Sequence, residues 1–146
     1  MKLISHRGNL DGPGSEATEN NPELISEVLK TYDVEIDLWS INGALFLGHD
    51  RPVFQISRSF LEHSRLWIHA KNLSVVDYLT TTRTNWFWHE SDELTITSRG
   101  FPWCLTNVWV NGGIMVVTKE DYYIPPDSGL YGICTDFITH YSRISQ

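Results

Sequence analysis

Two histidines and two carboxylates stand out in the first fifty residues because of where they fall in the hydrophobic pattern. His6 and His49 each follow a short apolar segment and precede a polar turn. Glu35 and Asp37 alternate within an extended apolar segment, so both side chains leave the same face of a strand. Imidazoles with a pKa near ~6.5 can transfer protons at neutral pH, and carboxylate oxygens bind hard divalent cations that neutralise phosphate oxygens. The pattern therefore predicts metal-assisted phosphodiester chemistry.

Each of these residue types also has a structural explanation. Two acids at i and i+2 usually face solvent, and a single histidine is most often structural, which is our interpretation of His63 and His140. Arg7 offers a planar fork for a phosphate oxygen, and an ion pair with a carboxylate explains it equally well. The joint spacing of the two histidines and the two acids favours a catalytic site.

The elements that must position these residues are short strands with few helices. Pro22 marks the first turn of a helix with Asn20 or Asn21 as its cap, and Asn42-Gly43 predicts a tight hairpin. A second hairpin is expected around the turn at residues 99–102. We expect strands at residues 2–5, 34–39, 44–47, 66–71, 85–89, 93–98, 103–106, 114–118 and 132–135, and helices at 22–31, 73–80 and 137–145.

Strands separated by helices or loops, with polar groups where the strands end, indicate an α/β fold of the parallel barrel type. We expect one domain over residues 1–146. Such barrels normally need at least roughly 200 residues, so the prediction is a reduced TIM-type (β/α) barrel with several outer helices short or missing. The many aromatic residues would cover the exposed strand faces or form a homodimer interface, and core packing is the expectation for most of them. They include Trp67, Trp86, Trp88, Trp103 and Trp109.

The net charge of −7 and the pI near 5.2 argue against a protein that binds a nucleic-acid backbone. The sequence has no apolar run of the ~20 residues that a membrane span needs, and no signal-peptide pattern precedes His6. We therefore expect a soluble, cytoplasmic protein. Cys104 and Cys134 lack metal-binding spacing and are expected to be buried thiols.

Five short motifs together resemble the amino-terminal signature of the glycerophosphodiester phosphodiesterase family, within the phospholipase-C-like phosphodiesterases that fold as TIM barrels. They are His6-Arg7-Gly8, Glu19-Asn20, Glu35-Ile36-Asp37, Asn42-Gly43 and Gly48-His49-Asp50. Two later segments, Ile68-His69-Ala70-Lys71 and Gly132-Ile133-Cys134-Thr135-Asp136, resemble family strands that usually carry Glu-x-Lys and Gly-x-x-Thr-Asp. The resemblance covers residues 3–50 well and residues 66–72 and 132–136 moderately; none is recognised between 73 and 131.

The resemblance implies a role for each matched residue. His6 and His49 would be the general acid and base, and Glu35 and Asp37 would bind the metal. The further roles implied are phosphate contacts from Arg7 and Lys71, orientation of His6 or Arg7 by Glu19, capping of the helix by Asn20, and supporting positions in the pocket for Asp50 and Asp136.

His69 stands where the family supplies a third carboxylate to the metal. Mg²⁺ or Ca²⁺ is the ion expected first, and Mn²⁺ or Zn²⁺ becomes more plausible if the imidazole of His69 is a ligand. Outside the matched motifs, His89 is a candidate acid, base or substrate contact with a structural role as its alternative. Trp103 is a candidate apolar wall against a glycerol or sugar-like group.

The expected substrate is a small glycerophosphodiester such as glycerophosphocholine, as the resemblance implies. Attack by water and attack by a neighbouring hydroxyl of the substrate, which gives a cyclic phosphate first, both stay open. The alternative function is a non-catalytic protein that binds a phosphate ligand, because His69 replaces an acid. A purely structural role is the third hypothesis.

Overall fold

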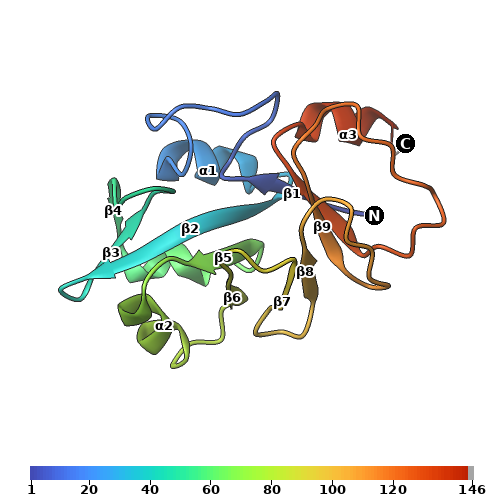
Figure 1. Ribbon diagram of the computed structural model, residues 1–146. Helices are drawn as coiled ribbons and strands as arrows, with labels where there is room; N and C mark the ends of the chain where they lie inside the picture. Colours follow the sequence, from blue (N-terminus) through green and yellow to red (C-terminus); the bar gives the residue numbers. More distant parts are fainter. Residues whose placement is uncertain (145–146) are drawn as a thin grey trace.

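The computed structural model describes residues 1–144 and contains one mixed sheet of ten strands, drawn as arrows in Figure 1. The strands are β1 (Lys2–His6), β2 (Asp33–Ile41), β3 (Ala44–Leu47), β4 (Phe54–Ile56), β5 (Leu66–Ala70), β6 (Trp86–Trp88), β7 (Leu94–Ile96), β8 (Pro102–Cys104), β9 (Ile114–Val117) and β10 (Gly132–Thr135). The helices are α1 (Pro22–Val28), α2 (Leu73–Leu79) and α3 (Ile138–Ile144), with the 3-10 helix η1 (Arg58–Glu62).

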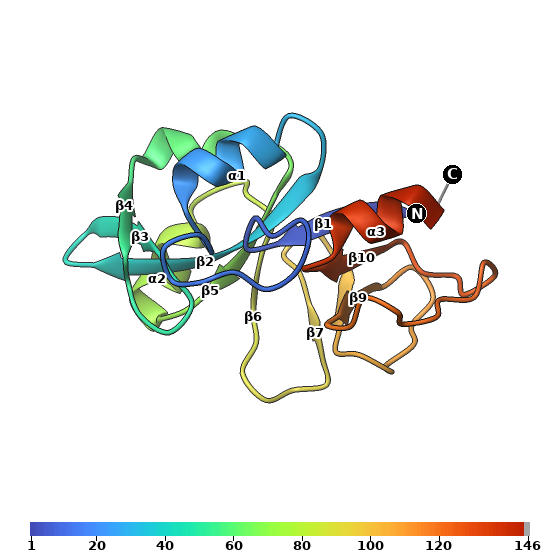
Figure 2. The ribbon, with the colours of Figure 1, turned by 90° about the horizontal axis from the view of Figure 1, so that it is seen from above.

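Most strands run parallel, in the order β6-β5-β2-β1-β10-β9-β8. The long strand β2 pairs with β1 along its first half, with β5 on its other side, and with the antiparallel β3 along its second half. At the far edge β7 is antiparallel to β8. Strands β6 and β7 run next to each other (Figure 2). The backbone N–H of Ser98, just after β7, donates to the carbonyl of Trp86 over 2.7 Å.

The expected TIM-type (β/α) barrel is wrong. The sheet forms a half-barrel, and residues 1–144 contain only three short α-helices. After β8 and after β9 the chain continues through residues 105–113 and 118–131 without a helix. Polar residues at strand ends suggested the barrel, but parallel strands place such residues at one edge of a sheet whether or not helices connect them. The fold is therefore mostly sheet.

Three hydrophobic clusters hold the sheet. The alternation of β2 sends Val34, Ile36 and Leu38 to one face, where residues of α1, α2 and η1 cover them. The opposite face packs side chains from β1, β5, β6, β8, β9 and β10 against one another, and α3 covers a third cluster with Tyr141. The members of the inner cluster are Ile4, Trp67, Phe87, Trp103, Ile114 and Cys134. Glu35 and Asp37 point to this inner face because they alternate with the apolar residues of β2.

Several local predictions are confirmed. Asn42 and Gly43 both have positive φ, 50° and 80°, as a two-residue hairpin between twisted strands requires. The second hairpin joins β7 to β8. Strand β4 and helix η1 were not predicted, and α1 ends at Val28 rather than near Thr31. The terminal helix was predicted over 137–145 and spans Ile138–Ile144, and Ser145 lies outside the described residues.

The aromatic residues fill the core more often than they cover the surface. Trp67 and Trp103 are buried, and Trp86 and Trp88 are partly buried against the cluster that α1, α2 and η1 cover. Trp109 departs from this pattern, because 43% of its surface is exposed. The prediction of two buried free thiols, Cys104 and Cys134, is confirmed. Among residues 1–144, no helix has the length and apolar character needed to cross a membrane.

Candidate active site

A cleft with a volume of about 430 Å³ lies at the carboxyl ends of the parallel strands. One side, which we call the polar wall, consists of His6, Arg7, Glu35, His49, His69 and Lys71. The other side, which we call the apolar wall, consists of Phe87, Trp88, Trp103, Leu105 and Val116. His89 and Glu90 also line it. Parallel strands direct their last side chains to one edge of a sheet, which is why residues far apart in the sequence meet here.

Two buried carboxylates lie together at the polar wall: Glu35 belongs to it, and Asp37 lies beside it in contact with Arg7, His69 and Lys71. Glu35 and Asp37 are 2% and 1% exposed. Burial, reinforced by the charge of Asp37, raises the pKa of Glu35 above its usual value. Burial acts in the same direction on Asp37, but the neighbouring His69, Arg7 and Lys71 outweigh it and hold the pKa of Asp37 well below its usual range. The pair therefore carries negative charge that the fold compensates only in part.

Two atoms of this carboxylate pair have no hydrogen bond within residues 1–144. They are Oε2 of Glu35 and Oδ1 of Asp37, and both are buried. Buried polar atoms in folded proteins are almost always hydrogen-bonded, so these two oxygens, one on a residue of the cleft and one beside it, indicate a missing partner. A cation is the partner that suits two carboxylates, because it removes their mutual repulsion.

His69 supplies a third group at the same point. It pairs in register with Asp37 across β2 and β5, and its Nδ1 lies 3.1 Å from Oδ1 of Asp37 and 3.9 Å from an oxygen of Glu35. Its Nε2 lies 2.9 Å from the carbonyl oxygen of His89. A carbonyl only accepts, so Nε2 carries a proton. Nδ1 either donates to Asp37 from the charged ring or, when the ring loses that proton, presents a lone pair to a cation at the carboxylates.

The three groups fit a divalent ion. One ligand atom from each of Glu35, Asp37 and His69 lies within 4.8 Å of the others. Adjacent ligands of an octahedral ion with bonds of about 2.1 Å are roughly 3 Å apart. A lone pair held 3.1 Å from a carboxylate oxygen is unfavourable unless a proton or a cation lies between them. Donor type, burial and spacing all agree with a metal site.

His6 is held from both sides. Its Nδ1 lies 2.9 Å from Oδ1 of Asp136, and its Nε2 lies 3.9 Å from Glu35. Burial lowers the pKa of His6, but the hydrogen bond to Asp136 and the charge of Glu35 outweigh burial, so the pKa lies above its usual value. His6 is thus biased toward the protonated form.

His49 has the opposite bias. It lies in the turn after β3, where the carbonyl of Arg51 would be 2.0 Å from a β-carbon on Gly48, so the turn requires glycine. Burial and the positive charges of Arg7 and Lys71 outweigh the acidic neighbours of His49 and lower its pKa. Its Nδ1 lies 2.8 Å from Oδ1 of the exposed Asp50. Neutral His49 and protonated His6 are the forms that a base and an acid need.

Two fixed positive charges complete the polar wall. Arg7 has a φ of 55°, which is costly for a residue other than glycine, and backbone hydrogen bonds with Glu35 and Asn20 hold it there. Its Nε lies 3.2 Å from Oδ2 of Asp37, and its Nη1 donates to Glu19 over 3.0 Å. Nζ of Lys71 lies 3.5 Å from Oδ1 of Asp37. Both side chains line the cleft.

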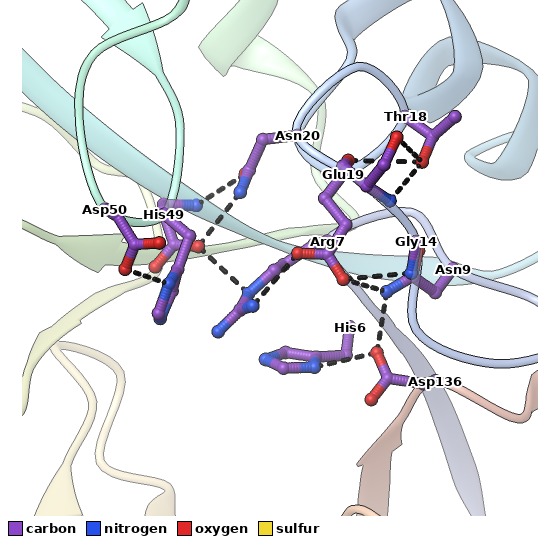
Figure 3. A network of polar contacts seen from close by, with 12 residues as sticks. His6, Arg7, Asn9, Gly14, Thr18, Glu19, Asn20, His49, Asp50 and Asp136 are labelled. Atoms are coloured by element: carbon purple, nitrogen blue, oxygen red, sulfur yellow. Dashed lines mark hydrogen bonds and ion pairs between the residues drawn. The ribbon is translucent and has the colours of Figure 1, made fainter.

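A hydrogen-bonded network behind the cleft fixes His6 and Arg7 relative to each other, as Figure 3 shows. Asn9 is its centre, because its Nδ2 donates to Oδ1 of Asp136 over 2.7 Å and to Oε1 of Glu19 over 2.9 Å. Glu19 also accepts from the backbone of Gly14. Glu19 thus contacts Arg7, and Asp136 contacts His6.

The prediction that Asn20 caps α1 is wrong, because the cap is Asn21, whose side chain accepts from the backbone of Glu23 and Leu24. Asn20 is fully buried with a φ of 58°, and its amide forms two hydrogen bonds of 2.9 Å with Asp37. Sequence reasoning also missed Asn9. Asparagine tolerates positive φ, but spacing alone does not reveal where its amide points.

The remaining sequence candidates are divided between the cleft and its surroundings. Trp103 lies in the apolar wall, stacked on Phe87 with ring centroids 4.4 Å apart. His89 lines the cleft, and its carbonyl orients His69. Asp136 supports His6 from behind, and Asp50 faces a smaller neighbouring hollow. The structure thus brings the predicted catalytic, phosphate and metal residues together on one wall.

No protein-family model matches the chain, and neither a curated protein nor a solved structure matches it. The resemblance to glycerophosphodiester phosphodiesterases therefore stays a prediction from short motifs.

Proposed function

We propose that this protein is a metal-dependent phosphodiesterase that acts on small glycerophosphodiester-like molecules. The observation that carries the proposal is the meeting of two kinds of group in one cleft. Glu35 in the cleft and Asp37 beside it each have a buried oxygen without a hydrogen bond, and two histidines with oppositely shifted pKa values line the same cleft. Phosphodiester cleavage needs all three of these groups: a cation against the phosphate, a base for the attacking hydroxyl and an acid for the leaving alkoxide.

The two histidines divide the proton transfers. His49, held neutral, takes the proton from the attacking hydroxyl, which belongs either to water or to the substrate itself. His6, held protonated by Asp136, gives a proton to the alkoxide that leaves. The products are an alcohol and either a phosphomonoester or a cyclic phosphate.

The phosphate is an anion, and the polar wall supplies its counter-charges. Arg7 and Lys71 line the cleft and stabilise the negative charge that grows on the phosphate oxygens. Glu35, Asp37 and His69 would hold a divalent cation, which would supply further positive charge against the phosphate. Asn20 and the carbonyl of His89 hold Asp37 and His69 in the orientation that these contacts need.

The ligand set favours a borderline cation. An imidazole nitrogen beside two carboxylates suits Mn²⁺ or Zn²⁺ better than it suits Ca²⁺ or Mg²⁺, which prefer oxygen. The position of Nδ1 of His69 beside Asp37 makes the imidazole part of the site. We therefore propose Mn²⁺ or Zn²⁺ ahead of the hard ions that the motifs alone suggest.

A second candidate function is binding of a phosphate ligand without turnover. It is favoured by the contacts of Asp37, whose two oxygens lie 3.2 Å from Arg7 and 3.5 Å from Lys71. A carboxylate neutralised by the protein's own cations has less need of a metal.

Hydrolysis assays distinguish the two functions. Bis(p-nitrophenyl) phosphate and then glycerophosphocholine are incubated with the protein and Mn²⁺, Zn²⁺, Mg²⁺, Ca²⁺ or EDTA. Glu35→Gln is the test variant, and the exposed Glu93→Gln is its control. Metal-dependent turnover that Glu35→Gln alone abolishes supports the enzyme. Binding of the diester by the folded protein, with no product on any metal, supports the binding protein instead.

A further inference from the structure

The end of the half-barrel opposite the candidate active site has a second cleft, of about 510 Å³. Leu66, the first residue of β5, and Asn85, which precedes β6, line it. His69, near the other end of β5, lines the first cleft. The two clefts therefore lie at opposite ends of the same strands.

This second cleft is basic although the chain is acidic overall. The chain has 18 acidic residues against 11 lysines and arginines. Three arginines line the cleft, namely Arg58, Arg83 and Arg99, and Glu62 is the acidic residue among the described lining groups. Within residues 1–144 the ion pairs of arginine involve Arg7 and Arg51, so the three guanidinium groups of this cleft have no carboxylate partner within 4.0 Å.

Contacts without negative charge hold two of these side chains. The guanidinium of Arg58 lies over the ring of Tyr78, with 5.3 Å between Cζ and the ring centroid. Nη2 of Arg99 donates to the backbone carbonyl of Arg83 over 2.9 Å. These contacts restrict the guanidinium groups before any ligand arrives, which lowers the entropy cost of binding.

A buried amide points to a ligand independently of the charge. Asn85 lines the same cleft and is only 5% exposed, and its Oδ1 has no hydrogen-bond partner within residues 1–144. Such an acceptor is costly unless a donor reaches it. Leu61 and Leu66 are the apolar part of the lining.

We propose that this cleft binds the phosphomonoester of a small organic molecule. Arginine binds phosphate with its planar fork, and two or three guanidinium groups match the two charges of a phosphomonoester. The volume exceeds what a phosphate alone fills, and a hydroxyl on the attached organic group would donate to Asn85. The proposal does not depend on the function of the first cleft.

Calorimetric titration with glycerol 3-phosphate and with inorganic phosphate tests the site. The titrations use Lys71→Gln as background, so that binding in the first cleft is weakened. We expect one site that prefers the ester to inorganic phosphate, and Arg99→Gln to weaken binding by about tenfold or more. Arg143→Gln, which removes the same charge from the exposed end of α3, is the matched control and should bind as the background does.

Three results would overturn the proposal. Unchanged affinity in both Arg99→Gln and Arg83→Gln would show that the arginines do not bind the ligand. Equal losses in Arg99→Gln and Arg143→Gln would show a diffuse charge effect instead of a site. Binding to vesicles that contain phosphatidic acid, without binding of the free ester, would assign the arginines to a lipid surface. Both arginines are exposed, so thermal melts of the variants should match the background.

Discussion

The two walls of the candidate active site differ in what their residues can do. The polar wall, with Asp37 beside it, holds the charged groups to which we assign chemistry, and most of these side chains contact one another or the network around Asn9. The apolar wall offers surface, with Trp103 stacked on Phe87. Chemistry and substrate fit therefore belong to different segments: β1, β2, β5 and the turn after β3 supply the first, and β6, β8 and β9 supply the second. Changes to the polar wall should therefore affect turnover, and changes to the apolar wall should affect substrate binding.

The largest effect is expected from Glu35→Gln. Loss of a metal ligand should lower turnover by about 10³-fold, since even the supporting residues of metal sites contribute roughly 10- to 100-fold. The folded state raises the pKa of Glu35, so the charged carboxylate destabilises the metal-free protein at neutral pH and less so as the pH falls. Glu35→Gln should therefore raise the melting temperature at pH 7 in EDTA. A variant that is both active and less stable would contradict this account.

Removal of either histidine should lower turnover by ~10²-fold or more while the protein stays folded. The pH profile of kcat/KM separates their roles. His49 acts neutral with a lowered pKa, so activity should fall only below pH 6.5, and His6 acts protonated with a raised pKa, so activity should fall only above pH 6.5. His49→Gln should remove the acid limb and leave the alkaline limb. Loss of the alkaline limb in that variant would reverse the two roles.

His69→Glu tests whether the imidazole selects the ion. A third carboxylate should shift preference from Mn²⁺ or Zn²⁺ toward Mg²⁺ and Ca²⁺, with a change in the ratio of dissociation constants of about tenfold. Calorimetry of ion binding, without substrate, measures this ratio. The same ratio in both proteins would exclude His69 from the ligand set.

Asn9→Ala removes the bridge between Glu19 and Asp136. His6 and Arg7 would then lose their fixed relation, and kcat should fall by about tenfold with little change in KM. Because Asn9 is 7% exposed, thermal melting must accompany the assay. Asn9→Asp is the stricter variant, since it places a third carboxylate between two others. A change in KM alone would show that Asn9 acts on substrate binding.

The smallest effect on chemistry is expected from the apolar wall. Trp103→Leu should raise KM by a few fold and leave kcat close to that of the wild type, because the side chain contributes surface and no charge. Val116→Ala is a milder change in the same wall. A large loss of kcat in Trp103→Leu would contradict the assignment of chemistry to the polar wall and of substrate fit to the apolar wall.

The residues of the polar wall could be picked out from the sequence, whereas the architecture of the fold could not. The alternation of Glu35 and Asp37 and the hairpin at Asn42-Gly43 are local signals, because the period of a strand and the φ of a turn depend on neighbouring residues. The half-barrel depends on contacts between residues far apart in the sequence. Whether a helix follows β8 and β9 depends on how residues 105–113 and 118–131 pack, and these segments contain no periodic pattern that predicts it.

The same limit explains the two asparagines. Asn20 and Asn21 are equally good caps by composition, and the direction of each amide follows from the path of the loop over the sheet edge. Asn9 gave no signal, because the acids it joins are far apart in the chain: Glu19 belongs to the same loop, and Asp136 follows β10. Such hydrogen-bond partners can be identified only when the order of the strands in the sheet is known.

The central claim is that one metal site, formed by Glu35, Asp37 and His69, drives phosphodiester cleavage. The most direct test measures the rate of cleavage and the binding of Mn²⁺ over the same range of ion concentrations, with ³¹P NMR to identify the product. The account predicts that the two curves have the same midpoint and that both disappear in Glu35→Gln. Cleavage that continues at full rate in EDTA, or tight Mn²⁺ binding with no phosphodiester cleaved, would contradict it.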